Sequence, residues 1–98
     1  MNANEYINGM ADLIRTTSAE YVKVEDVNGK KRIAAKFHSV SEMNAEMKKA
    51  FIANAETLKA LNAGLKALRA SGEIKSASNR WAPTLLEGGI EFRMDFGF

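Results

Sequence analysis

The sequence predicts an α+β fold with a short N-terminal helix, a β-hairpin, one long amphipathic helix and a C-terminal strand that completes a small antiparallel sheet. Three observations predict it. Residues 20–38 contain an Asn-Gly pair between two alternating runs, residues 41–71 repeat apolar side chains at helical spacing, and residues 90–98 alternate apolar and charged side chains. These are the periods of a hairpin, an amphipathic helix and a half-buried strand. At 98 residues the chain is expected to form a single domain over 1–98.

The first segment, residues 1–16, is predicted to form a short helix. Tyr6 and Met10 lie one turn apart, and further apolar residues continue their stripe. Asn2 or Asn4 can cap the start of this helix, because an Asn side chain accepts hydrogen bonds from backbone N–H groups that the first turn leaves free.

Residues 20–38 are predicted to form a β-hairpin. Asn28 and Gly29 suit a two-residue type I′ turn, in which both positions need a positive φ. The register set by this turn gathers five apolar side chains on one face: Val22, Val24, Ile33, Ala35 and Phe37. On the other face it places Glu25 opposite Arg32, where we expect a cross-strand ion pair.

Residues 41–71 are predicted to form one long helix, capped by Ser39 or Ser41 and stopped at Gly72. Side chains at alternating spacings of four and three residues form a heptad seam: Met47, Phe51, Asn54, Leu58, Leu61, Leu65 and Leu68. Asn54 is its polar interruption, and a single buried Asn can fix the register between paired helices.

The length of this helix favours self-association. Thirty residues of helix span about 45 Å, whereas a compact domain of this size has a diameter of roughly 33 Å. The heptad seam would overhang its own domain, and a second copy of the chain is the expected cover. Alternatively, the helix bends or breaks near residues 62–64 and packs as two pieces on a monomer.

The last part of the chain is predicted to be an irregular loop over residues 73–89, followed by a strand over residues 90–98. Pro83 cannot lie within a helix, and the Gly88-Gly89 pair indicates a turn. In the strand, five apolar side chains fall on one face: Ile90, Phe92, Met94, Phe96 and Phe98.

The chemistry available argues against an enzyme. His38 is the only histidine, and no cysteine is present. No nucleophile motif surrounds His38, and no cluster has the spacing of metal ligands, so we expect no catalytic residues, no metal and no cofactor. The sequence has no stretch long and apolar enough for a membrane span and does not begin like a secretory signal, so a cytoplasmic location is expected.

Two surfaces are candidates for binding. The charged face of the hairpin gathers five residues that could contact phosphates or nucleic acid: Tyr21, Lys23, Lys30, Arg32 and Lys36. Exposed strands also carry lysine simply to prevent edge-to-edge aggregation, which would make this an ordinary solvated surface.

The second surface is aromatic. Arg80 and Trp81 stand together in the predicted loop, and these residue types are the most enriched at binding hot spots. Phe98 carries the terminal carboxylate, so its ring could lie in an interface. These three residues are predicted to contact a partner, which for Arg80 and Trp81 is a protein or a small ligand; alternatively, Trp81 caps one end of the core.

The long helix carries its own cations, which flank the heptad seam and are expected to keep the outside of the helix solvated: Lys48, Lys49, Lys59, Lys66 and Arg69.

The function predicted from these features is that of a small non-enzymatic binding protein. It is expected to be a homo-oligomer through the long helix and to bind or inhibit a protein partner or a compact ligand. Small phage-type and accessory proteins share this size and composition, but no motif supports the analogy. The alternative is a nucleic-acid or nucleotide-binding module that uses the basic face of the hairpin. The net charge of +2 permits an acidic partner without requiring one.

Overall fold

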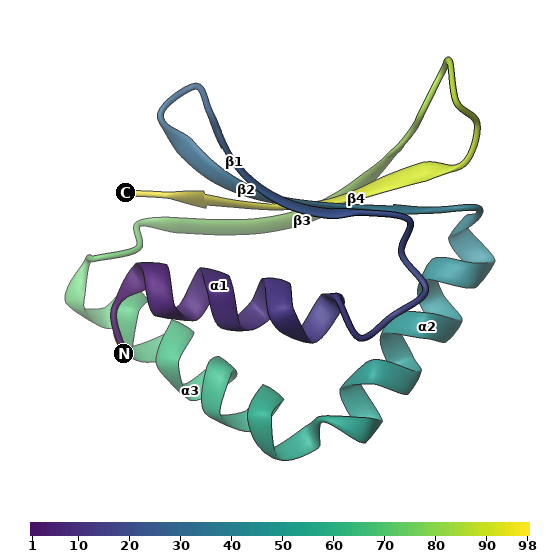
Figure 1. Ribbon diagram of the computed structural model, residues 1–98. Coiled ribbons are helices and arrows are strands. Elements are labelled where there is room, and N and C mark those ends of the chain that lie inside the picture. The colour runs from purple at the N-terminus through teal and green to yellow at the C-terminus, as the bar shows by residue number, and fades with distance from the viewer.

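The computed structural model describes all residues, 1–98, and confirms the α+β class. Its seven elements are α1 (Ala3–Ile14), β1 (Val22–Val27), β2 (Lys30–Phe37), α2 (Val40–Ala53), α3 (Ala55–Ser71), β3 (Ser76–Pro83) and β4 (Ile90–Gly97). The strands form one antiparallel sheet in the order β1-β2-β4-β3. All three helices lie on the same side of this sheet, and its other face is open to solvent (Figure 1). No helix combines the length and the apolar character that crossing a bilayer requires.

Helix α1 begins with a complete capping box. The Asn2 side chain accepts a hydrogen bond from the Glu5 backbone N–H at 2.8 Å, and Glu5 Oε1 accepts one from the Asn2 N–H at 3.1 Å. These bonds satisfy donors that the first turn leaves free. The apolar stripe of the helix is buried against the sheet, with Tyr6 and Ile14 fully inaccessible.

The β1–β2 hairpin has the predicted register. Val24 pairs with Ile33, and Asn28 and Gly29 have φ values of 51° and 77°. The predicted Glu25–Arg32 ion pair is wrong, although the two residues lie opposite each other. Arg32 instead binds Asp95 of β4 through two hydrogen bonds, at 2.7 and 3.2 Å. A carboxylate that accepts two hydrogen bonds from the guanidinium binds it more strongly than an exposed Glu on an edge strand would.

The prediction of one long helix is wrong, because the chain breaks at Asn54. This residue has φ −117° and ψ 36°, and its side-chain amide donates to the Ala50 carbonyl at 2.8 Å. Asn side chains often compete in this way for backbone hydrogen bonds. The break divides the segment into α2 and α3, which meet in a V (Figure 1). The alternative break near residues 62–64 is also not observed, since α3 is continuous there.

The bend brings the heptad seam back onto its own chain. Leu61 and Leu68 are buried, and Gly9 of α1 lets α3 come close: a Cβ added there would lie 2.9 Å from Leu61 Cδ2. The Cα atoms span 39 × 33 × 15 Å, so no rod projects beyond the body. The overhang that predicted self-association through the long helix is therefore absent.

The predicted loop over residues 73–89 is wrong for Ser76–Pro83, which form strand β3 at the edge of the sheet. This strand is polar and mostly exposed, so it lacks the apolar alternation of a strand packed on a core. Pro83 is tolerated because it ends an edge strand. The turn that Gly88 and Gly89 predict does connect β3 to β4.

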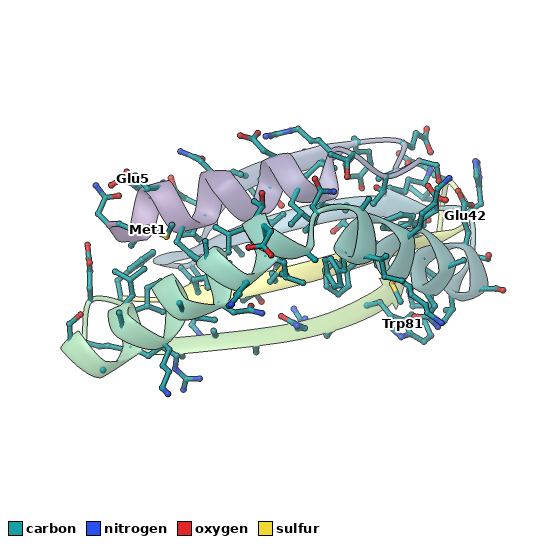
Figure 2. The ribbon with its side chains drawn as sticks, turned by 90° about the horizontal axis from the view of Figure 1, so that it is seen from below. Met1, Glu5, Glu42 and Trp81 are labelled. Atoms are coloured by element: carbon teal, nitrogen blue, oxygen red, sulfur yellow. The ribbon has the colours of Figure 1, made fainter.

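Strand β4 confirms the predicted C-terminal strand and lies in the middle of the sheet. Ile90, Met94 and Phe96 are buried, and the Phe96 ring meets Tyr6 edge to face at 5.5 Å. Seen from the helix side, α1 covers one side of the sheet and α2 and α3 cross the middle, while β3 runs along the opposite side (Figure 2). The inner face of the β3–β4 half is thus only partly covered.

Candidate functional site

The incomplete cover leaves an apolar groove of about 530 Å³ between the helices and the β3–β4 half of the sheet. Eleven of its sixteen lining residues are hydrophobic, so contact with apolar groups is its main chemical property. From α1 and the sheet come Tyr6, Met10, Ala77, Phe92, Met94 and Phe96. From the V of α2 and α3 come Met43, Met47, Phe51, Leu58 and Leu65.

Methionine is prominent in this lining. Four of the five methionines in the chain face the groove: Met10, Met43, Met47 and Met94. Met is unbranched and polarizable, so it adapts to irregular shapes and is common at surfaces that accept varied partners. The wall can therefore adjust to an occupant.

The polar residues around the groove are few. Asn44, Asn62 and Asn79 supply amide groups, and Arg69 is the one charged residue in the lining. Ser78 also lines the groove, but its side chain faces outward because it pairs with Asp95. Leu58, Asn62, Leu65 and Arg69 all come from one face of α3, where they are four, three and four residues apart.

Most of the predicted seam either faces this groove or is buried. Met47, Phe51, Leu58 and Leu65 line the groove, whereas Leu61 and Leu68 are buried in the core and Asn54 forms the helix break. The seam residues thus divide between the core, the groove and the helix break. The sequence pattern does not show that the chain would fold this apolar surface around a groove.

Arg80, Trp81 and Phe98 do not form one surface. Arg80 and Trp81 are neighbours in a strand, so their side chains point to opposite faces of the sheet. Trp81 shares the inner face with Phe92 and is 47% exposed. Trp81 is not among the groove's lining residues, although its cross-strand partner Phe92 is, and Figure 2 shows Trp81 toward the α2 end of the molecule. Phe98 follows Gly97, which pairs with Ser76 at the other end of β3.

The predicted basic face of the hairpin exists, but carboxylates neutralise much of it. The register places Lys23, Lys30, Arg32 and Lys36 on the outer face of the sheet, and Tyr21 joins them. Lys36 Nζ is buried and lies 3.0 Å from carboxylates of Glu20 and Glu87, and Arg32 is paired with Asp95. Two of the predicted cations, Lys23 and Lys30, form no ion pair.

Strand β4 brings the countercharges that the sequence did not reveal. The Tyr21 hydroxyl donates to Glu91, and Arg93 Nε lies 2.7 Å from the other oxygen of that carboxylate. Burial, together with the hydrogen bond to Glu91, raises the pKa of Tyr21. Burial acts to raise the pKa of Glu91 as well, but hydrogen bonds from Tyr21 and Arg93 outweigh it and the pKa is lowered. The ammonium of Lys23 lies 4.3 Å from the Tyr21 ring centre, in cation–π contact.

His38 and its neighbouring serines have structural surroundings. Ser39 caps α2 by accepting a hydrogen bond from the Glu42 N–H at 3.0 Å. The backbone N–H of His38 donates to the Glu42 carboxylate at 3.2 Å, and the Ser18 hydroxyl donates to the same carboxylate. These bonds fix the junction between β2 and α2. No group of three or more His, Asp and Glu side chains converges in a way that could hold a metal ion.

Comparison with family models, with curated proteins and with solved structures found no match. The proposals for this site therefore rest on its own geometry and chemistry.

Several groove residues were not predicted as functional from the sequence. Met43, Asn44, Asn62 and Asn79 carry no motif, and Arg69 resembles any other solvating cation on a helix surface. The helical spacing did contain a signal for two of them. Asn62 and Arg69 stand four residues after Leu58 and Leu65, respectively, so they lie on the same face of α3 as these leucines.

Proposed function

We propose that this chain is a small non-enzymatic binding protein whose site is the groove between the V of α2 and α3 and the β3–β4 half of the sheet. The groove takes the apolar part of a compact ligand. One observation carries this proposal: a largely apolar cavity of about 530 Å³ adjoins the core and is lined from every element except the β1–β2 hairpin.

The dimensions and composition of the groove support this function. Ligand sites in proteins commonly enclose about 300–1,000 Å³ and combine apolar walls with a few polar groups that orient the ligand. Here Phe92, Leu58 and Leu65 are only partly buried, so an occupant would remove further apolar surface from water. Asn62 and Asn79 provide hydrogen-bonding groups at the wall.

A neutral fluorescent dye such as Nile red tests the groove directly. The substitution Ala77→Trp fills the groove from β3, and we expect it to weaken dye binding by at least about tenfold, the ratio that 1.4 kcal/mol represents. Ala82→Trp is the matched control, because Ala82 pairs with Glu91 and lies on the opposite face of the same strand.

Circular dichroism would show that both variants keep the fold. Binding that is unchanged in Ala77→Trp, or lost equally in both variants, would contradict the groove as the site.

A second candidate function is protein binding, including self-association, through the end of the β3–β4 hairpin. Leu85 and Leu86 are 94% and 100% exposed, and Trp81 lies in the same hairpin. Adjacent exposed leucines of this kind can contribute to a protein contact. Sedimentation over a range of concentrations tests self-association, and the double variant Leu85→Ser and Leu86→Ser should then lower any oligomer mass to that of the monomer.

Nucleic-acid binding by the outer face of the sheet is the weaker alternative. Its support is the set of cations that form no ion pair, Lys23 and Lys30, together with Arg80, whose nearest carboxylate oxygen is 4.0 Å away. Such binding should weaken steeply as salt is added. Exchanging Lys23 and Lys30 for Ser should remove most of it, whereas a flat salt response would exclude this function.

A further inference from the structure

The groove contains a single cation and no countercharge. Arg69 is the only charged residue among the sixteen that line it, and no carboxylate lies within ion-pairing distance of Arg69 anywhere in the structure. We propose that the ligand of the groove is an aliphatic monocarboxylate, whose carboxylate binds Arg69 and whose chain lies along the methionine-rich wall. This proposal rests on the groove being the binding site.

The position of Arg69 gives the groove a polar end. The residue lies in the last turn of α3, seven residues before Ser76 begins β3. Asn79 of that strand pairs with the inward-facing Met94 and lines the groove, so an amide is available at the groove wall. The partial negative charge at the C-terminus of α3 favours a cation at this position. It is too small to neutralise the full charge of the Arg69 guanidinium.

The opposite end of the groove is uncharged and mainly apolar. Met43, Met47 and Phe51 come from α2 together with one amide, Asn44, and Phe92 of β4 pairs with Trp81. Figure 2 shows Trp81 toward the α2 end of β3, whereas the end of α3 lies toward the other end of β3. A ligand with one charged head and one apolar tail fits this division in a single orientation.

A carboxylate matches the cation better than a phosphate does. The planar guanidinium donates two parallel hydrogen bonds to the two oxygens of a carboxylate. A phosphate dianion would carry a second charge, and no other cation lines the groove to balance it. The head group of the ligand therefore carries a single negative charge.

Decanoate and decanol, used as probes below their aggregation thresholds, separate the two parts of this inference. They have the same chain length, but only decanoate is charged. Trp81 is the sole tryptophan and pairs with Phe92, which lines the groove, so its fluorescence reports binding to the full chain. Decanoate should bind about tenfold tighter than decanol, since hydrogen bonds to a charged group contribute roughly that factor.

The substitution Arg69→Met keeps an unbranched apolar stem like that of Arg and removes the charged guanidinium. It should weaken decanoate binding about tenfold and leave decanol binding unchanged. Lys66→Met is the matched control, because Lys66 is an exposed cation on α3 that does not line the groove. Circular dichroism of both variants should match that of the original chain.

The outcomes distinguish this inference from the function on which it rests. Equal binding of the two probes, or unchanged decanoate binding in Arg69→Met, would overturn the monocarboxylate and leave the groove as a site for neutral ligands. Binding of neither probe would overturn both proposals. A protein that sediments as a dimer and binds neither probe would identify a second copy as the occupant instead.

Discussion

The two hairpins of the sheet have the same antiparallel pairing, but the helices cover them to different extents. In β2, the inward-facing Ile33 and Ala35 are completely buried. In β3, the inward-facing Asn79 and Trp81 are exposed, and no helix lies over the outer edge of the strand (Figure 2). The β1–β2 hairpin thus contributes to the core, whereas β3 is held mainly by its backbone pairing with β4.

This difference shows how a small domain can retain a site. A chain of this length buries a limited fraction of its surface, so complete cover of all four strands would leave little room for a cavity. Here the core is concentrated beneath α1, around Tyr6, Ile33 and Phe96. The remaining apolar surface of α2, α3 and β4 forms the groove.

The largest expected effect on stability is in the covered half. Ile33→Ala should lower the free energy of unfolding by about 3–4 kcal/mol, because it leaves a cavity at a completely buried position. Urea unfolding followed by circular dichroism measures this change. A loss below 1 kcal/mol would mean that the hairpin is not as tightly packed as the structure indicates.

A smaller, pH-dependent effect on stability is expected at the pairing of β2 with β4, where the two hairpins of the sheet meet. Asp95→Asn removes the carboxylate that binds Arg32, both side chains being mostly buried, and should cost about 1–2 kcal/mol at neutral pH. The hydrogen bond from Arg32 lowers the pKa of Asp95 below its ordinary 3.8. The stabilisation is therefore complete above that pH and is lost as the pH falls through the folded-state pKa.

Urea unfolding of the original chain and of Asp95→Asn at several pH values tests this linkage. The stability difference between them should shrink as the pH falls below 3.8. A difference that grows on acidification would contradict the proposed role of the pair.

The open half should tolerate truncation better. Leu65 is half-buried at the groove, and Leu65→Ala should cost only about 1 kcal/mol, since part of the side chain is already in water. The same variant should weaken binding of a neutral apolar probe. Dye titration and urea unfolding on one sample compare the two effects; a stability loss equal to that of Ile33→Ala would erase the distinction between the halves.

The smallest expected effect is at the tip of the β3–β4 hairpin. Exchanging Leu85 and Leu86 for Ser should change the free energy of unfolding by less than about 0.5 kcal/mol, because both side chains are exposed. Thermal unfolding measures this change. A large destabilisation would show that these leucines pack against the domain in solution.

Features set by neighbouring residues were predicted well from the sequence. Asn28 and Gly29 determine the hairpin turn, and the turn then determines which side chains face each other. The alternation in β4 is equally local, because one face packs on the core and the other carries charge. The charged face of the hairpin follows from the same register.

Features that depend on the rest of the fold were not predicted. Strand β3 has no apolar period because no core covers it, so its sequence resembles a loop. Asn54 continues a heptad pattern, but its side chain bonds to Ala50 and ends a helix there. The groove depends on where α2, α3 and β3 come to lie, and no local pattern encodes that arrangement.

The adjacency of β2 and β4 in the middle of the sheet has a consequence for folding kinetics. This pairing joins Phe37 to Ile90, with both helices of the V between them in the chain. Each hairpin can close early from neighbouring residues, whereas the central strands must search over a long loop before they meet. We expect their docking to limit the folding rate, so changes at Arg32 and Asp95 should slow refolding more than changes at the Asn28-Gly29 turn.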